Sequence, residues 1–236
     1  MSERLPSIGG VRLLLIRHGQ TPHNVTGELD TARPGAGLTP LGEAQARAVP
    51  AALRGTEIAA VHASTLVRTQ LTAAPLAEER GATVHVHDGL REIAAGDLEL
   101  RADEEAVRGY AECVGAWMFG DLDRRMPGGS DGHDFLERYD GAVRSALDGH
   151  RADATVAVFS HGAAIRAWAT RAARLDPAAA VELRMPNTGM VELEGDPEKG
   201  WTLVSWPTEP LGGAALQDPA AHDVTGESAE EAAETG

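Results

Sequence analysis

The chain has 236 residues, of which 42% are hydrophobic, enough for one substantial core and too few for two ordinary domains with linkers. Its formal net charge of -15 argues against a nucleic-acid binder, because such proteins need a basic face to neutralise phosphates. Any anionic ligand must therefore be held by a few local arginines.

Cysteine content and hydropathy restrict the cellular setting. Cys113 is the single cysteine, which excludes an internal disulfide framework and a thiolate zinc cluster. The N-terminal segment MSERLPSIGG lacks the apolar core of a signal peptide, and no apolar run approaches membrane-spanning length. We therefore expect a cytoplasmic protein without a membrane partner.

The first half of the chain predicts alternating strands and helices. Val11–Ile16 (VRLLLI) is a continuous apolar run typical of a strand covered on both faces, and Thr155–Ser160 (TVAVFS) is a second such run. Thr39 and Pro40 begin a helix in LTPLGEAQARAVPAAL, which Pro50 ends or kinks. A strand over 57–64, a helix over 65–81 closed by Gly81 and a strand over 82–88 follow.

The second half completes the expected α/β fold. Residues 102–119 and 131–150 predict two helices joined by the breaker-rich segment GDLDRRMPGGS. A helix over 163–174, a strand pair over 179–185 and 189–195, and a last strand over 201–206 follow. This alternation predicts an α/β three-layer sandwich, with a mostly parallel mixed sheet flanked by helices.

The end of the chain has a different composition. The stretch DPAAHDVTGESAEEAAETG contains acidic and small residues and no lysine, arginine or aromatic side chain. It has too little apolar surface to offset the entropy lost on ordering. We therefore predict a folded domain over 1–207 and an acidic, disordered, solubilising tail over 208–236.

Both continuous strands end in a His-Gly pair. LLLIRHG delivers His18 and Gly19, and VAVFSHG delivers His161 and Gly162. In open α/β sheets ligands bind at this carboxyl edge, and glycine permits close backbone approach. A lone histidine is more often a hydrogen-bonded structural residue, but the repetition at two strand ends favours one functional pocket.

Arginines give this pocket its expected ligand. Arg17 carries a planar, permanently charged fork suited to phosphate or carboxylate. Arg68 lies in the first turns of the helix after the strand over 57–64, although its spacing alone also fits a solvated arginine. With Gly162 near a helix start, backbone N–H groups add anion affinity. The sum predicts a locally positive, dianion-sized pocket.

Five segments resemble, in the usual order, the blocks of the histidine phosphatase superfamily, also called phosphoglycerate mutase-like. They are LIRHGQTPHN, LTPLGEAQA, STLVRTQLTA, LREIAAG and FSHGAAIR. An RHG tripeptide alone is a weak motif, but four ordered companions make the match specific. The resemblance covers residues 11–206 and implies that the domain over 1–207 is a histidine phosphatase-like catalytic domain.

The resemblance also implies a mechanism. His18 would be the nucleophile and would form a phosphohistidine. Arg17, Arg68 and His161 would disfavour its protonation and stabilise charge on the transferring phosphoryl group. A hydrogen bond from the second ring nitrogen of His18 to a backbone carbonyl would fix the tautomer.

The segment that carries the candidate acid departs from the family pattern. Glu92 falls at the family position of the acid that protonates the leaving alkoxide, and Glu99 is a rival. Relatives commonly show an aromatic and a Glu-Gly after the acid, whereas this chain has GDLELRAD. The longer histidine- and tyrosine-bearing loop of glycolytic mutases and their later arginine-rich segment are missing, which favours a phosphatase over a mutase.

Further residues match family positions that line the phosphate. The substrate-binding set implied in this way comprises Arg17, Gln20, Thr21, Asn24, Arg68 and Gly162. Asn187 or Thr188, in RMPNTGMVEL, either faces the pocket or forms a plain turn.

Two other functions stay open on the residues alone. A metal hydrolase would use His85, His87 and Asp88 of VHVHDG, but the usual further histidine is absent at Leu90, and solvent-facing strand histidines explain the pattern better. A non-catalytic phospho-ligand binding protein would be expected to have lost one of the five catalytic residues, all of which are present. We therefore expect a small phosphorylated metabolite as substrate, no cofactor and no metal; a homodimer stays open.

Overall fold

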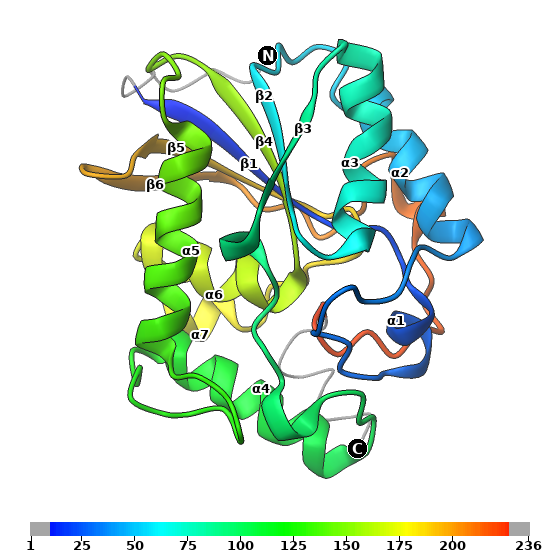
Figure 1. Cartoon of the computed structure of the whole chain (residues 1–236), viewed down its shortest axis with the longest axis vertical. Helices are drawn as coiled ribbons and strands as arrows, with labels where there is room; N and C mark the ends of the chain where they lie inside the picture. Colours follow the sequence, from blue (N-terminus) through cyan, green and yellow to red (C-terminus); the bar gives the residue numbers. More distant parts are fainter. Residues whose placement is uncertain (1–9, 227–236) are drawn as a thin grey trace.

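The computed structural model describes residues 10–226, and its centre is a six-stranded sheet in the order β3-β2-β4-β1-β5-β6 (Figure 1). The first four strands in this order are parallel, and β5 and β6 are antiparallel to their neighbours. The predicted fold class is confirmed. The strands are β1 (Val11–Arg17), β2 (Ala60–Ser64), β3 (Val84–His87), β4 (Thr155–Ser160), β5 (Met190–Asp196) and β6 (Gly200–Ser205).

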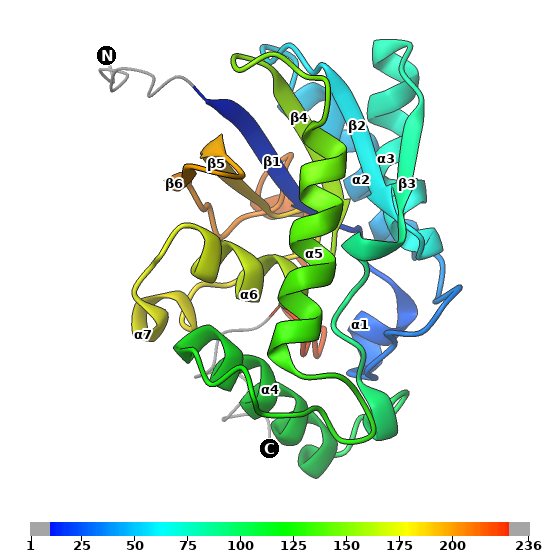
Figure 2. The same cartoon turned by 60° about the vertical axis from the view of Figure 1, so that its left-hand side comes forward.

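Helices cover both faces of the sheet (Figures 1 and 2). α2 and α3 cover one face, α5 and α6 cover the other, and α4 and α7 pack on α6. No helix within residues 10–226 is long and apolar enough to cross a membrane. The helices are α1 (Pro22–Thr26), α2 (Pro40–Ala52), α3 (Val67–Arg80), α4 (Glu104–Phe119), α5 (Gly132–Leu147), α6 (Gly162–Ala172) and α7 (Pro177–Ala180).

The apolar run of β1 is buried from both sides. Leu13 and Leu15 belong to the core under α4, α5 and α6, whereas Leu14 and Ile16 belong to the core under α2 and α3. Successive side chains of a strand point to opposite faces, so a central strand needs an apolar residue at every position. Burial on both faces therefore explains the continuous run and fixes the carboxyl end of β1 in the middle of the sheet.

Cap residues lie at most of the predicted helix ends. At the start of α2, Thr39 Oγ1 accepts the N–H of Gly42 at 3.0 Å, and Pro40 is the first helical residue. Gly81 closes α3 with a φ of 61°, a conformation that favours glycine. Pro50 lies inside α2, and the helix ends soon after it at Ala52.

The prediction of a strand over residues 179–185 is wrong. The region holds the end of α7 and a turn, while β5 pairs with β1 and β6. Asp176 caps α7 by accepting the N–H of Ala178 at 3.1 Å, and Pro177 occupies the first helical position. A cap followed by proline and alanines favours a helix over the apolar pattern that comes after it.

The segment after Pro207 differs from its prediction over residues 208–226. It lies against the domain, contains a short 3-10 helix over Ala214–Leu216, and its red end runs beside α1 in Figure 1. Leu211 and Val224 are partly buried against the two cores. The low apolar content does not predict this order, because polar contacts hold much of the segment. Residues 227–236, the rest of the predicted tail, lie outside the described residues.

His62 in β2 makes the stability of the fold sensitive to acid. Its ring centroid lies 5.0 Å from that of His87, 5.3 Å from that of His85 and 6.5 Å from that of His150. Burial, and then the charges of these rings, lower the pKa of His62 to about 4. An unfolded histidine titrates at about 6.5, so protonation favours the unfolded chain as the pH falls from about 6.5 to 4.

The substitution His62→Gln tests this contribution. We compare the free energy of unfolding, measured in urea, at about pH 7 and pH 5. Its decrease between these pH values should be about 1–2 kcal/mol smaller in this variant than in the native chain. His133→Gln removes an exposed histidine at the start of α5, whereas His150 of the cluster follows the end of α5, and the variant should keep the native pH dependence. The same acid sensitivity in H62Q and the native chain would contradict the contribution of His62.

Candidate active site

The carboxyl ends of β1 and β4 bring two histidines together, as the sequence predicts. The strands are parallel neighbours, and Arg17 pairs in register with Ser160, the residue before His161. His18 follows β1, His161 precedes α6, and their ring centroids lie 5.2 Å apart. Both rings are almost completely buried. They therefore form one site at the sheet edge where ligands bind in open α/β folds.

His18 has the tautomer that a nucleophile needs. Its Nδ1 lies 2.8 Å from the carbonyl oxygen of Gly19, and a carbonyl can only accept, so Nδ1 carries the proton. Nε2 keeps its lone pair. Burial, and then the charges of Arg68 and Arg17, hold the pKa of His18 well below its ordinary value. The ring is therefore neutral near pH 7.

Arg17 and Arg68 are buried cations beside these rings, with 0% and 3% exposure. Arg68 donates one N–H to the backbone oxygen of Asp30 at 2.8 Å. A second terminal nitrogen of Arg68 lies 3.4 Å from the Asp30 carboxylate. Nε of each arginine and Nδ1 of His161 have no hydrogen-bond partner among residues 10–226. Because buried donors are costly to leave unsatisfied, these nitrogens indicate a ligand with several anionic oxygens.

Ser64, at the end of β2, orients His161. Ser64 Oγ lies 2.7 Å from Nε2 of His161 and accepts the N–H of Leu66 at 3.2 Å. Ser64 Oγ also lies 3.0 Å from Thr69 Oγ1; where Ser64 donates its proton to Nε2, the proton of the neutral ring lies on Nδ1. Burial, and then the charge of Arg68, hold the pKa of His161 well below its ordinary value. His161 is therefore a neutral ring next to His18, and in that tautomer its Nδ1–H is a hydrogen-bond donor.

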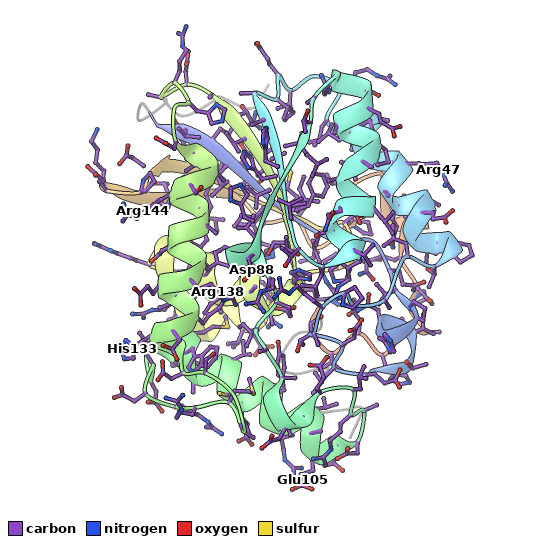
Figure 3. All side chains as sticks on the ribbon, viewed as in Figure 1. Arg47, Asp88, Glu105, His133, Arg138 and Arg144 are labelled. Carbon is purple, nitrogen blue, oxygen red and sulfur yellow. The ribbon has the colours of Figure 1, made fainter. Side chains whose placement is uncertain are left out.

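Glu92 lies in the segment after β3, and its buried carboxyl group contacts the first turn of α6. It accepts the N–H of Ala164 at 2.8 Å and that of Ala163 at 3.2 Å. Burial raises its pKa, which the hydrogen bonds and the arginines only partly oppose. Arg138 reaches from α5 toward the segment after β3 (Figure 3) and donates to the Glu92 backbone oxygen at 3.2 Å. The environment therefore favours a protonated Glu92, as an acid requires.

Glu99, the rival acid, is engaged elsewhere. Its carboxylate accepts the backbone N–H groups of Thr31 and Ala32, each at 2.8 Å, and the Thr31 hydroxyl. These bonds fix the loop that presents Asp30 to Arg68. The geometry thus favours Glu92 over Glu99 as the candidate acid. Glu99 instead holds the loop that contains Asp30.

The predicted phosphate-lining residues after β1 form the wall of the site. Thr21 caps α1, and Asn24 completes the capping box. The Gln20 N–H donates to Gln45 Oε1 at 2.7 Å, so this backbone group is already satisfied by the protein. The Asn24 side-chain amide donates to Asp223 at 3.0 Å.

A glycine and the late loop complete this wall. A Cβ on Gly162 would lie 2.3 Å from the Thr225 oxygen and 3.0 Å from Arg17 Nε, so only glycine fits there. Asn187 Nδ2 and the Thr188 N–H each donate to the His18 backbone oxygen at 3.2 Å. The late loop therefore borders His18 and is more than a remote turn.

Four side chains that hold the site escaped the sequence reasoning: Asp30, Ser64, Arg138 and Asp223. Ser64 ends a predicted strand at the same sheet edge as His18 and His161, and this position could have predicted that Ser64 lies near the site. Arg138 lies in the predicted helix over 131–150, and Asp30 and Asp223 come from segments without a local pattern. Only the tertiary fold brings these three side chains to Glu92, Arg68 and Arg17.

The residues of the metal alternative are not brought together as ligands. Within the described part of the chain, no group of three or more His, Cys, Asp or Glu side chains is arranged to hold a metal ion. His87 lies 2.8 Å from the His62 ring nitrogen, whereas Asp88 pairs with Arg33 and Arg91.

Comparisons with known proteins agree with this arrangement. Residues 13–209 match the model of the histidine phosphatase superfamily, branch 1. The chain belongs to this superfamily. Its phosphatases and mutases act on phosphate esters, which accounts for a buried site rich in cationic and hydrogen-bond-donating groups.

Individual relatives include proteins of different length. A PE-PGRS family protein of Mycobacterium tuberculosis is 38% identical over 85% of this chain, and the match spans only 37% of that protein. A probable phosphoglycerate mutase of Yersinia enterocolitica is 29% identical, over 90% of this chain and 98% of that protein.

Two solved structures are similar over most of their length. Mycobacterial glucosyl-3-phosphoglycerate phosphatase has a TM-score of 0.70 and 27% identity, over 83% of this chain and 98% of that one. A putative alpha-ribazole-5'-P phosphatase from Escherichia coli has a TM-score of 0.67 and 25% identity, over 86% of this chain and 98% of that one. The fold is thus shared with phosphatases of unlike substrates.

Glu99 is expected to support phosphate binding through Asp30 and Arg68. In Glu99→Gln the hydrogen bonds to the loop lose their charge, and the affinity for inorganic phosphate, measured by calorimetry, should fall by about five- to tenfold. The control Glu105→Gln removes an exposed carboxylate at the start of α4 (Figure 3) and should leave the affinity unchanged. Native affinity in E99Q would contradict this supporting role.

Proposed function

We propose that the chain is a phosphomonoester hydrolase that acts on a small phosphorylated metabolite through a phosphohistidine on His18. The observation that carries the proposal is the hydrogen bond of His18 Nδ1 to the Gly19 oxygen, which leaves the lone pair on Nε2, in a ring that burial and the charges of Arg68 and Arg17 keep neutral by lowering its pKa. A nucleophile and charge stabilisation are both needed, since phosphate monoester hydrolysis is among the slowest uncatalysed reactions.

In the first step, Nε2 of His18 attacks phosphorus and the bond from phosphorus to the ester oxygen breaks. Glu92 gives its proton to the leaving alkoxide. The Nε groups of Arg17 and Arg68 and Nδ1–H of His161 donate to the phosphoryl oxygens. Their donors are fixed before the reaction, so they need little reorganisation as charge develops.

In the second step, water attacks phosphorus and the N–P bond breaks. Glu92, now a carboxylate, takes a proton from the water, and inorganic phosphate leaves. The cycle restores neutral His18 and protonated Glu92. The two arginines and His161 supply the stabilising charge and donors, so the proposal requires no metal ion.

Hydrolysis is favoured over phosphoryl transfer between substrates. A mutase must protect its phosphorylated enzyme from water, whereas a phosphatase must admit water. The missing mutase blocks and the similarity to two phosphatase structures support hydrolysis. The relatives that are named probable mutases make mutase activity the alternative that must be measured.

His18→Ala tests the nucleophile. Turnover of p-nitrophenyl phosphate should fall by about a thousandfold or more, and the acid-labile phosphoenzyme found after rapid quenching should disappear. His133→Ala, at an exposed position, should keep both. Turnover or phosphoenzyme retained in H18A would eliminate the mechanism, and transfer of phosphate to a second substrate without net hydrolysis would favour a mutase.

Glu92→Gln tests the acid. Because an acid matters most when the leaving group is poor, the rate should fall by about 10² to 10³ for an alkyl phosphate and far less for p-nitrophenyl phosphate. The native rate with an alkyl phosphate should decrease as the pH rises through the raised pKa of Glu92, since the proton is then lost. E92Q should lack this limb of the pH profile. Equal losses for good and poor leaving groups would deny Glu92 this role.

A further inference from the structure

Residues 218–226 form a strap across the candidate active site. At one end Asp218 accepts the Gln20 side-chain amide at 2.9 Å, and at the other the Gly226 oxygen accepts the Met185 N–H at 2.9 Å. Between these ends the His222 N–H lies 3.5 Å from the Val25 oxygen. Residues of the strap, together with Gln20 and Asn187, line a cavity of about 70 Å³ that is partly open to solvent.

The strap places a carboxylate on the phosphate clamp. Asp223 accepts from both terminal nitrogens of Arg17, with one contact at 2.5 Å, and from the Asn24 amide at 3.0 Å. Thr225 Oγ1 and the Met185 oxygen take further Arg17 N–H groups at 2.9 and 2.7 Å. Nε is the Arg17 nitrogen left without a partner among the described residues.

The contacts of Asp223 coincide with those expected of a substrate. Arg17 and Asn24 are both assigned to phosphate binding, and a carboxylate presents its oxygens to a guanidinium in the same bidentate manner as a phosphate. Two anions cannot use the same N–H groups at once. With Asp223 in place, only Nε of Arg17 is left to donate to a phosphate. The positive charge of Arg17 is also already neutralised by Asp223.

Burial explains why an anion is needed when substrate is absent. Arg17 is completely buried, and an uncompensated buried cation is strongly unfavourable. Asp30 compensates Arg68, and Asp223 compensates Arg17. A phosphate dianion would supply the same compensation, so exchange of Asp223 for phosphate keeps the buried charge balanced.

The strap has few apolar anchors, and polar contacts hold it. Of residues 218–226 only Gly226 is buried, and Val224 is partly buried against the core. Segments held by few apolar contacts open at low free-energy cost. Displacement of the strap therefore does not require the domain to unfold.

We propose that the strap is an autoinhibitory lid: Asp223 occupies the phosphate donors of Arg17 and Asn24 in the free protein and is displaced when a phosphate monoester binds. The inference rests on the proposed function, because it needs these donors to bind phosphate. The opposite role, a fixed partner that holds Arg17 in place throughout catalysis, predicts opposite effects of the same variant.

The direct test is calorimetric titration of inorganic phosphate into the full-length chain and into Asp223→Asn. Removal of the competing charge should tighten phosphate binding about tenfold. Glu209→Gln removes an exposed carboxylate just before the strap and should bind as the native chain does. Unchanged or weaker binding in D223N would overturn the lid and assign Asp223 a fixed structural role.

Kinetics and exchange give independent readouts. D223N should lower KM for p-nitrophenyl phosphate and keep kcat near native, whereas loss of a fixed partner of Arg17 would lower kcat. Thr225→Ala, a milder change, should tighten phosphate binding about two- to threefold. Hydrogen exchange in residues 218–226 should rise when phosphate is added to the native chain, and a fall would contradict displacement.

The two proposals fail in different ways. If the native chain binds phosphate and hydrolyses esters but D223N binds no tighter, the lid alone is wrong. If neither protein binds phosphate or turns over any ester, the proposed function is wrong, and the lid is wrong with it.

Discussion

The burial of two arginines beside two neutral imidazoles is the constraint on which the site depends. Arg17 and Arg68 lower the pKa of His18, but their own charges need compensation away from solvent. Asp30 compensates Arg68 and Asp223 compensates Arg17. The site is therefore a balance of buried charges in which one anion belongs to the loop that Glu99 binds and the other to a strap with few apolar anchors.

Residues outside the reacting centre hold the side chains that are proposed to take part in the reaction. Glu99 fixes the loop of Asp30, and that loop positions Arg68. Arg138 binds the backbone around Glu92, and Ser64 orients His161. Such supporting contacts set tautomers and directions that the chemical groups alone do not determine.

The sequence predicts the features that depend on local patterns. The apolar run of β1 requires a strand buried on both faces, and parallel pairing with β4 then brings His18 and His161 to one edge. The roles of Asp30, Arg138 and Asp223 depend on contacts between distant segments, which no local pattern encodes. The tail shows the same limit, because its composition indicates too little apolar surface and says nothing of a carboxylate that fits Arg17.

The proposed mechanism depends on the hydrogen bond from His18 Nδ1 to the Gly19 oxygen, which leaves Nε2 as the attacking atom. The most direct measurement is the ³¹P NMR spectrum of the phosphoenzyme, trapped by rapid alkaline quenching and assigned by coupling to the imidazole protons. This mechanism predicts a single phosphohistidine at residue 18 with phosphorus on Nε2. Phosphorus on Nδ1, or on His161, would contradict it.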